Sequence, residues 1–189
     1  MMAAETERRI ALIHRVLIPD EDYPKEHAIL VTDKQSVFIR QPRTRSSFVL
    51  RGEMKFGTAL VTDVVPKTLE AYEQTSLESL AADTANLVVP HQALISFTMK
   101  ADKVEFRIMD FFQWLTMRMQ KEIFQVYNFE MKLQQGTAPA TGITFYAVPI
   151  GAYFKPRRET QTRETILREY ATEILEIYRK VLPARIISV

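Results

Sequence analysis

Residues 94–109 read LISFTMKADKVEFRIM, and this stretch decides the fold class. Every second residue is apolar in each half of it, which is the period-two pattern of a half-buried β-strand. Ala101 and Asp102 separate the halves, so the pattern predicts a hairpin of strands Leu94–Lys100 and Lys103–Met109. The residues expected on the apolar faces are Ile95, Phe97 and Met99 in the first strand and Val104, Phe106 and Ile108 in the second.

The same alternation recurs on both sides of this stretch and predicts further strands. Asp33 and Lys34 are expected to form the turn between two of them. Strands that follow one another through short turns indicate an antiparallel sheet rather than βαβ units. The expected strands are Ile10–Ile18, Ala28–Thr32, Ser36–Arg40, Phe48–Leu50, Ala59–Val65, Tyr127–Leu133 and Ile143–Val148.

Two segments have the spacing of amphipathic helices. From Thr162 to Leu182 apolar residues recur at helical spacing with charged residues opposite them, and Pro183 follows as a stop. A shorter helix is expected over residues 76–84, with Thr75 and Glu78 spaced as a capping box.

The segment Asp110–Gln125 fits two kinds of structure. Phe112, Leu115 and Met119 have helical spacing, but Leu115, Met117 and Met119 also alternate with polar residues as in a strand. The length of the segment and its unbranched side chains favour a helix, which is the prediction made here.

The composition indicates one globular α+β domain over residues 1–189. The chain is 47% hydrophobic, carries a net charge of +2 and has no cysteine. Disulfides and thiolate metal sites are therefore excluded. We expect a cytoplasmic protein, since no apolar stretch reaches the roughly 20 residues of a membrane span.

No catalytic or metal motif stands out in the sequence. His14, His27 and His91 are far apart and are expected to be structural. Five glycines leave no room for a phosphate-binding loop or a dinucleotide fingerprint. Acidic residues 20–22 lack the spacing of a calcium loop, so we expect a solvated turn there, no metal and no cofactor.

Two arginine clusters are candidate anion sites. The first comprises Arg40, Arg43 and Arg45, and the second comprises Arg157 and Arg158. The guanidinium fork suits phosphate, so either cluster could bind a phosphorylated ligand or an anionic membrane surface. The alternative is solvated loop charge, and the low net charge makes nucleic acid an unlikely partner.

Aromatic residues suggest a surface for a partner. If Asp110–Gln125 is a helix, Phe111, Trp114 and Met117 give it more apolar surface than one buried stripe needs. An exposed second apolar face would bind a protein partner or a second copy of the chain. The alternative is a helix buried on two sides.

Three segments resemble prokaryotic pleckstrin-homology-like (PH-like) domains. LVTDKQSVFI at residues 30–39 looks like the family's hairpin, and VPHQALISF at residues 89–97 is similar to its segment leading into a strand. The terminal amphipathic helix resembles the one that plugs the family's barrel. The chain is longer than a minimal member, so Pro66–Asn86 and Asp110–Gln125 would be insertions, and its final helix lacks the tryptophan common in eukaryotic members.

The resemblance implies a curved antiparallel sheet or partly open barrel, with a long C-terminal helix and one or two inserted helices. It also implies binding of lipids or proteins rather than catalysis. Our first hypothesis is a non-enzymatic binding or scaffold protein that engages a protein partner or itself. The second is recognition of a phosphorylated ligand or anionic membrane through the arginine clusters, and the third is an enzyme using scattered carboxylates.

Overall fold

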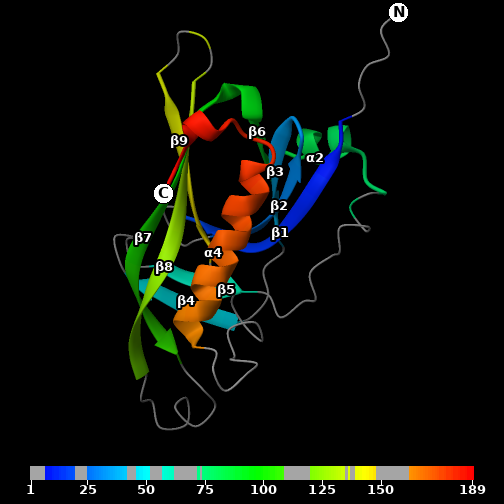
Figure 1. Ribbon diagram of the computed structural model, residues 1–189. Coiled ribbons are helices and arrows are strands. Elements are labelled where there is room, and N and C mark those ends of the chain that lie inside the picture. Colours follow the sequence, from blue (N-terminus) through cyan, green and yellow to red (C-terminus); the bar gives the residue numbers. More distant parts are fainter. Residues whose placement is uncertain are drawn as a thin grey trace, which may run out of the picture.

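The computed structural model describes residues 7–19, 25–41, 46–51, 57–61, 72, 74–108, 120–134, 136, 139–147 and 162–189. In this part of the chain a large β-sheet is accompanied by one long C-terminal helix and one short helix, so the protein is a sheet-rich α+β fold (Figure 1). The strands are β1 (Arg9–Ile18), β2 (Lys25–Thr32), β3 (Gln35–Arg40), β4 (Ser46–Arg51), β5 (Gly57–Val61), β6 (Leu87–Pro90), β7 (Leu94–Ile108), β8 (Gln120–Leu133), β9 (Thr141–Ala147) and β10 (Ile187–Ser188). The helices are α2 (Leu77–Ala82) and α4 (Arg163–Arg179), with 3-10 turns η1 (His91–Ala93) and η3 (Ala184–Ile186).

The described strands form one sheet in the order β5-β4-β7-β8-β9-β1-β2-β3-β6. Neighbours in this order are antiparallel, and β10 adds to β7 as a parallel strand. The sheet is not closed, because β5 and β6 lie at the two ends of the order.

The sheet is nevertheless strongly curved. β6 and β7 stand far apart in the strand order, yet the three residues of η1 join them directly. The run from β7 to β6 must therefore bend until its two ends approach one another at η1. Among the described residues, β1 pairs with β9 through Val16 and Leu17.

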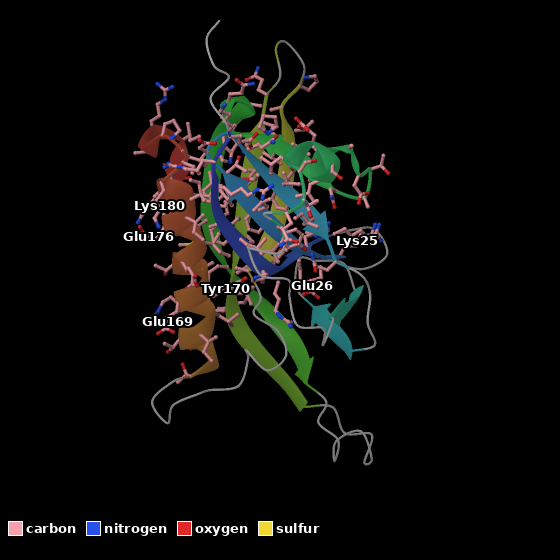
Figure 2. All side chains as sticks on the ribbon, turned by 90° about the vertical axis from the view of Figure 1, so that its right-hand side faces the viewer. Lys25, Glu26, Glu169, Tyr170, Glu176 and Lys180 are labelled. Carbon is pink, nitrogen blue, oxygen red and sulfur yellow. The ribbon has the colours of Figure 1, made fainter. Side chains whose placement is uncertain are left out.

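Helix α4 packs against the concave side of this curved sheet. Figure 2 shows Tyr170 on the side of α4 that faces the sheet, and Glu169, Glu176 and Lys180 on the side that faces away. Aromatic rings line the interior, with ring centroids 5.5 Å apart for Phe38 and Phe145 and 4.4 Å apart for Phe97 and Tyr178. The buried residues of the helix are Leu167, Ala171, Ile174, Leu175 and Tyr178, and Leu182 just beyond its end is buried as well.

Most of the predicted strands and both predicted helices are confirmed, with small shifts at their ends. Helix α4 begins after the cap Thr162, whose side chain accepts a hydrogen bond from the Thr165 amide. The capping-box prediction at Thr75 was one residue off, because Ser76 caps α2 by accepting from the Ser79 amide. Residues 62–65 and Val148, at the ends of two predicted strands, lie outside the described residues.

The predicted hairpin within residues 94–109 is wrong. β7 runs without a turn from Leu94 to Ile108, and β8 pairs with it along this length, so Ala101 and Asp102 lie inside a strand. The expected position of Ile95 is also wrong. The register slips between Leu94 and Ser96, and Ile95 in this bulge is 45% exposed.

The helix predicted over Asp110–Gln125 is wrong where the structure describes it. Residues 120–125 belong to β8 and pair with β7, while residues 110–119 lie outside the described part. Gln120, Lys121 and Glu122 have better helix than strand propensity, but pairing with a long neighbouring strand outweighs a difference of that size.

Within the described residues, no helix has both the length and the apolar character needed to cross a membrane.

Candidate functional site

One of the predicted site residues, Arg40, lies in the described part of the chain. It is exposed at the end of β3. The predicted residues outside the described part are Arg43, Arg45, Arg157 and Arg158 for the anion site, and Phe111, Trp114 and Met117 for the interface.

A β-bulge in β1 shapes the region beside Arg40. Ile13 pairs with Ile29 of β2, but the next pair is Val16 with His27, so two residues of β1 stand opposite one of β2. Arg15 in this bulge has a φ of 55°, a left-handed conformation that costs a non-glycine residue free energy. Bulges of this kind re-aim a side chain.

The bulge holds a buried charged pair. Arg15 is 8% exposed and Glu26 is 7% exposed, and Arg15 Nη1 lies 3.9 Å from Glu26 Oε1. Removing two charges from water costs several kcal/mol, which the attraction between them must offset. Glu26 is fixed further by its own backbone, whose carbonyl accepts a hydrogen bond from the Gln41 amide at 3.0 Å.

His27 lies next to this pair on β2 and opposite Arg40 on β3. It is buried, and its Nδ1 lies 3.0 Å from the carbonyl oxygen of Lys25. Burial lowers the pKa of His27, the bond to the Lys25 carbonyl opposes this, and the charges of Arg40 and Lys25 lower the pKa further. The imidazole is therefore neutral at pH 7.

We call the side chains of Lys25, His27 and Arg40 the Arg40 cluster. Successive residues of a strand point to opposite faces, so His27 and its partner Arg40 lie on the face opposite to Glu26. With His27 neutral, the charged members of the cluster are both cations, in a chain of net charge +2. Figure 2 shows Lys25 and Glu26 at the same end of β2, the strand against which β5 packs. The Arg40 amide is held by the side-chain oxygen of Asn86 at 3.1 Å, which anchors the exposed end of β3.

A second polar constellation is buried near the start of β3, the strand that ends at Arg40. Ser36 Oγ lies 2.9 Å from His91 Nε2 and 3.1 Å from the hydroxyl of Tyr178. Burial raises the pKa of Tyr178, so its hydroxyl keeps its proton, and burial lowers the pKa of His91 despite the opposing effects of Asp33 and Glu7. Both hydrogen bonds form if Tyr178 donates to Ser36 and Ser36 donates to Nε2 of the neutral imidazole.

A serine beside a histidine is also the beginning of a nucleophilic site, but this pair is poorly placed for one. Ser36 and Tyr178 are fully buried, so a substrate carbonyl has no path to the serine oxygen. The chain of hydrogen bonds joins β3, η1 and α4, and its role is to fix the helix on the sheet.

The described residues contain no group of three potential metal ligands drawn from histidine, cysteine, aspartate and glutamate. The acidic residues 20–22 considered above lie outside the described part.

Sequence reasoning missed both constellations. Arg15 follows His14 in a strand pattern that gives no sign of a bulge, so its burial was not foreseen. Ser36, His91 and Tyr178 are far apart in the chain, but each lies in one of the three segments that resemble PH-like domains. The location of one of these residues in each of the three segments is the signal from which the hydrogen-bond network could have been inferred.

With this geometry in view, the chain was compared with protein-family models, curated proteins and solved structures, and none of the three comparisons gives a match.

Proposed function

We propose that this chain is a non-enzymatic binding protein that recognises an anionic group at the Arg40 cluster. The single observation that carries the proposal is the exposed Arg40 side chain on the strand position opposite buried His27.

The charges support recognition of an anion rather than a cation. Glu26 points to the opposite face of β2 and is partnered there by Arg15, so its carboxylate offsets little of the positive potential at Arg40. Arg40 and Lys25 both lower the pKa of His27, which is what a positive potential at the imidazole does. An arginine in such a place can bind a phosphate or carboxylate through two parallel hydrogen bonds.

The architecture supports a binding role of PH-like character. The three segments that resemble the family meet at the Ser36, His91 and Tyr178 hydrogen bonds. The terminal helix packs inside a curved antiparallel sheet, as the resemblance implies. We therefore retain a PH-like character as part of the proposal, together with a protein partner or second copy at Phe111, Trp114 and Met117.

Calorimetric titration with inorganic phosphate and with phosphoserine tests the anion site, at low and at high salt. Vesicles of phosphatidylcholine with and without phosphatidylserine, in a sedimentation assay, separate a free phosphate from a membrane surface. We expect binding that weakens steeply as salt rises, because the contacts are ionic. Arg40→Gln should weaken it about tenfold or more, since hydrogen bonds to charged groups contribute about 1.5–3 kcal/mol.

Arg185→Gln is the matched control, because Arg185 is an exposed arginine in η3, a different part of the fold. The proposal is wrong if neither phosphate, phosphoserine nor anionic vesicles bind at low salt. It is also wrong if Arg40→Gln and Arg185→Gln weaken binding equally.

A further inference from the structure

Several contacts hold the C-terminal end of the chain on the sheet. The hydroxyl of Tyr178, in the last turn of α4, lies 3.1 Å from Ser36 Oγ of β3. The ring of Tyr178 lies against Phe97 of β7, with centroids 4.4 Å apart, and Ile187 of β10 pairs with the same phenylalanine. Figure 1 shows how the chain turns back after α4, so that its C-terminus lies beside β7.

These contacts join the end of the chain into one unit. Phe97 contacts the ring of Tyr178 and also pairs with β10. The amides of Val181 and Leu182 donate to the carbonyl of Tyr178 at 3.2 and 2.9 Å. A displacement of Tyr178 would therefore loosen everything that follows it. We call residues 178–189 the C-terminal segment.

His91 acts on the hydrogen bond of Tyr178 through Ser36. Its Nε2 lies 2.9 Å from Ser36 Oγ, and the residue is 9% exposed, with Nδ1 buried as well. When Nε2 accepts the hydrogen bond of Ser36, the neutral ring carries its own proton on Nδ1. A second proton must then add at Nε2, the atom that faces the serine.

The number of hydrogens in the network determines what protonation does. With a neutral ring, the hydroxyl hydrogens of Tyr178 and Ser36 serve the two contacts that join Tyr178 to Ser36 and Ser36 to His91. Protonation adds a third hydrogen at Nε2, but the number of contacts stays the same. One hydrogen is then left without an acceptor among these three side chains, and an unsatisfied donor in the interior is costly. The cost is relieved when the Tyr178 hydroxyl leaves Ser36 and reaches water.

We propose that Ser36, His91 and Tyr178 form a pH-sensitive latch, which holds the C-terminal segment on the sheet while His91 is neutral and releases it when His91 is protonated. In the opening step a proton from solvent binds Nε2, and Ser36 changes from the donor to the acceptor of that hydrogen bond. Tyr178 then withdraws from the serine, and the rest of the C-terminal segment follows it.

The groups around His91 set the pH range of the latch. The charge of Glu7, the charge of Asp33 and the Asp33 backbone carbonyl all raise the pKa of His91, but burial lowers it by more. Lys34 meets His91 through its backbone carbonyl, which accepts from the His91 amide at 2.8 Å, and Tyr178 faces the ring from α4 with its hydroxyl protonated. In the released state the ring meets water and regains its ordinary pKa of about 6.5, so release is favoured as pH falls below about 6.5.

Amide hydrogen exchange of the full-length chain, followed by NMR at about pH 7.5 and about pH 5.5, tests the latch. Each rate is divided by the rate of an unstructured peptide at the same pH, which leaves the extent of opening. We expect opening at Val181 and Leu182 to increase at the lower pH about tenfold more than opening at Phe129 and Met131 of β8. An equal increase at both places would mean that the whole fold opens, and would overturn the proposal.

His91→Gln is the informative variant, because an amide side chain does not titrate in this range. It should abolish the pH dependence that distinguishes the C-terminal segment from β8. His14→Gln is the matched control, since the pKa of His14 is also lowered, by burial and by Arg15, but His14 lies in β1 outside the latch. This control should keep the full pH dependence.

The wild-type chain gives an independent test that does not require either variant to fold. The midpoint of the release should coincide with the titration of the His91 ring, which NMR resolves from that of His14. The latch is overturned if the release follows His14 instead, or if the C-terminal segment opens no more than β8 does. It is also overturned if the pH dependence persists in a folded His91→Gln variant. The latch does not depend on the Arg40 cluster, so its failure would leave the proposed anion site standing.

Discussion

Ser36 Oγ and the hydroxyl of Tyr178 lie 3.1 Å apart although 142 positions separate the two residues in the chain. The contact joins β3 to α4 in the interior, and His91 at the start of η1 is bonded to the same serine. A single hydroxyl thus links the helix, the central sheet and the corner where the sheet bends back on itself. The stability of the fold should depend on it more than on either of its partners.

Ser36→Ala should cost more stability than Tyr178→Phe. The alanine variant leaves both His91 Nε2 and the Tyr178 hydroxyl without their shared partner in the interior, at about 1–3 kcal/mol for each orphaned group. The phenylalanine variant leaves Ser36 bonded to His91, so we expect a loss of about 0.5–1.5 kcal/mol. Urea titration of each variant gives the free energy of unfolding that decides this.

Thr172→Ala provides the control for these two variants, because Thr172 is an exposed hydroxyl residue on the same helix as Tyr178. We expect its effect to stay within about 0.5 kcal/mol. If Ser36→Ala is no more costly than Tyr178→Phe, the serine is not the centre of the network.

The protein should lose stability as pH falls below about 6.5. Burial lowers the pKa of His14, His27 and His91 in the folded chain, so the unfolded chain takes up protons first. The stabilising effect of the neutral imidazoles is complete above the ordinary histidine pKa of about 6.5, and it is lost as pH falls through the lowered values. His91→Gln should reduce the slope of the unfolding free energy between about pH 7.5 and 5.5.

The neighbouring Gln92→Ala should leave that slope unchanged, because Gln92 is exposed and does not titrate. If the His91→Gln variant keeps the wild-type slope, His91 has the same pKa in the folded and unfolded chains, and this prediction is wrong.

Arg15 and Glu26 should behave as a coupled pair. Removing either partner alone leaves an uncompensated charge in the interior, which costs about 3–5 kcal/mol. The double variant Arg15→Met, Glu26→Leu removes both charges and should be less destabilised than the sum of the single changes. A double-mutant cycle by urea titration measures the coupling, and additive effects would mean that the charges are independently solvated.

The aromatic segment should control oligomeric state if Phe111, Trp114 and Met117 meet a second copy. Light scattering coupled to size exclusion should then find an oligomer of the wild-type chain. The variant Phe111→Ala, Trp114→Ala should be a folded monomer, because the apolar contact is lost. A wild-type monomer, with a variant that unfolds easily, would place these aromatics in the core and end the interface hypothesis.

Much of the fold could be predicted from local patterns, because most strands lie with one face in the core. The alternation of apolar and polar residues fails to predict burial where a strand contains a β-bulge. In β1 both Ile13 and Val16 reach the main core, three positions apart, because the bulge at Arg15 adds a residue. The same effect exposes Ile95, which the alternation placed inside.

The hairpin error in β7 has a related cause. The apolar positions change from odd to even numbers between Met99 and Val104, and a turn is the simplest local reason for such a change. The strand instead continues, supported by β8 along its length. Pairing between distant segments is not visible in a window of ten residues. For the same reason the burial of Arg15 against Glu26 could not be foreseen, because the two residues lie on different strands and the bulge that carries Arg15 leaves no mark on the sequence.

The join between β1 and β9 has a kinetic consequence. β1, β2 and β3 pair as sequence neighbours, and so do β8 and β9, whereas the join depends on Val16 and Leu17 meeting a strand that lies near the other end of the chain. Closing so long a loop costs entropy before any contact repays it, so each half of the sheet should assemble on its own and the join should form last. The same join should be the first part of the interior to exchange its amide hydrogens, since two residue pairs form it in the described part of the chain. A folding intermediate of this protein would then consist of two separate sheets in which β1 and β9 have not yet paired.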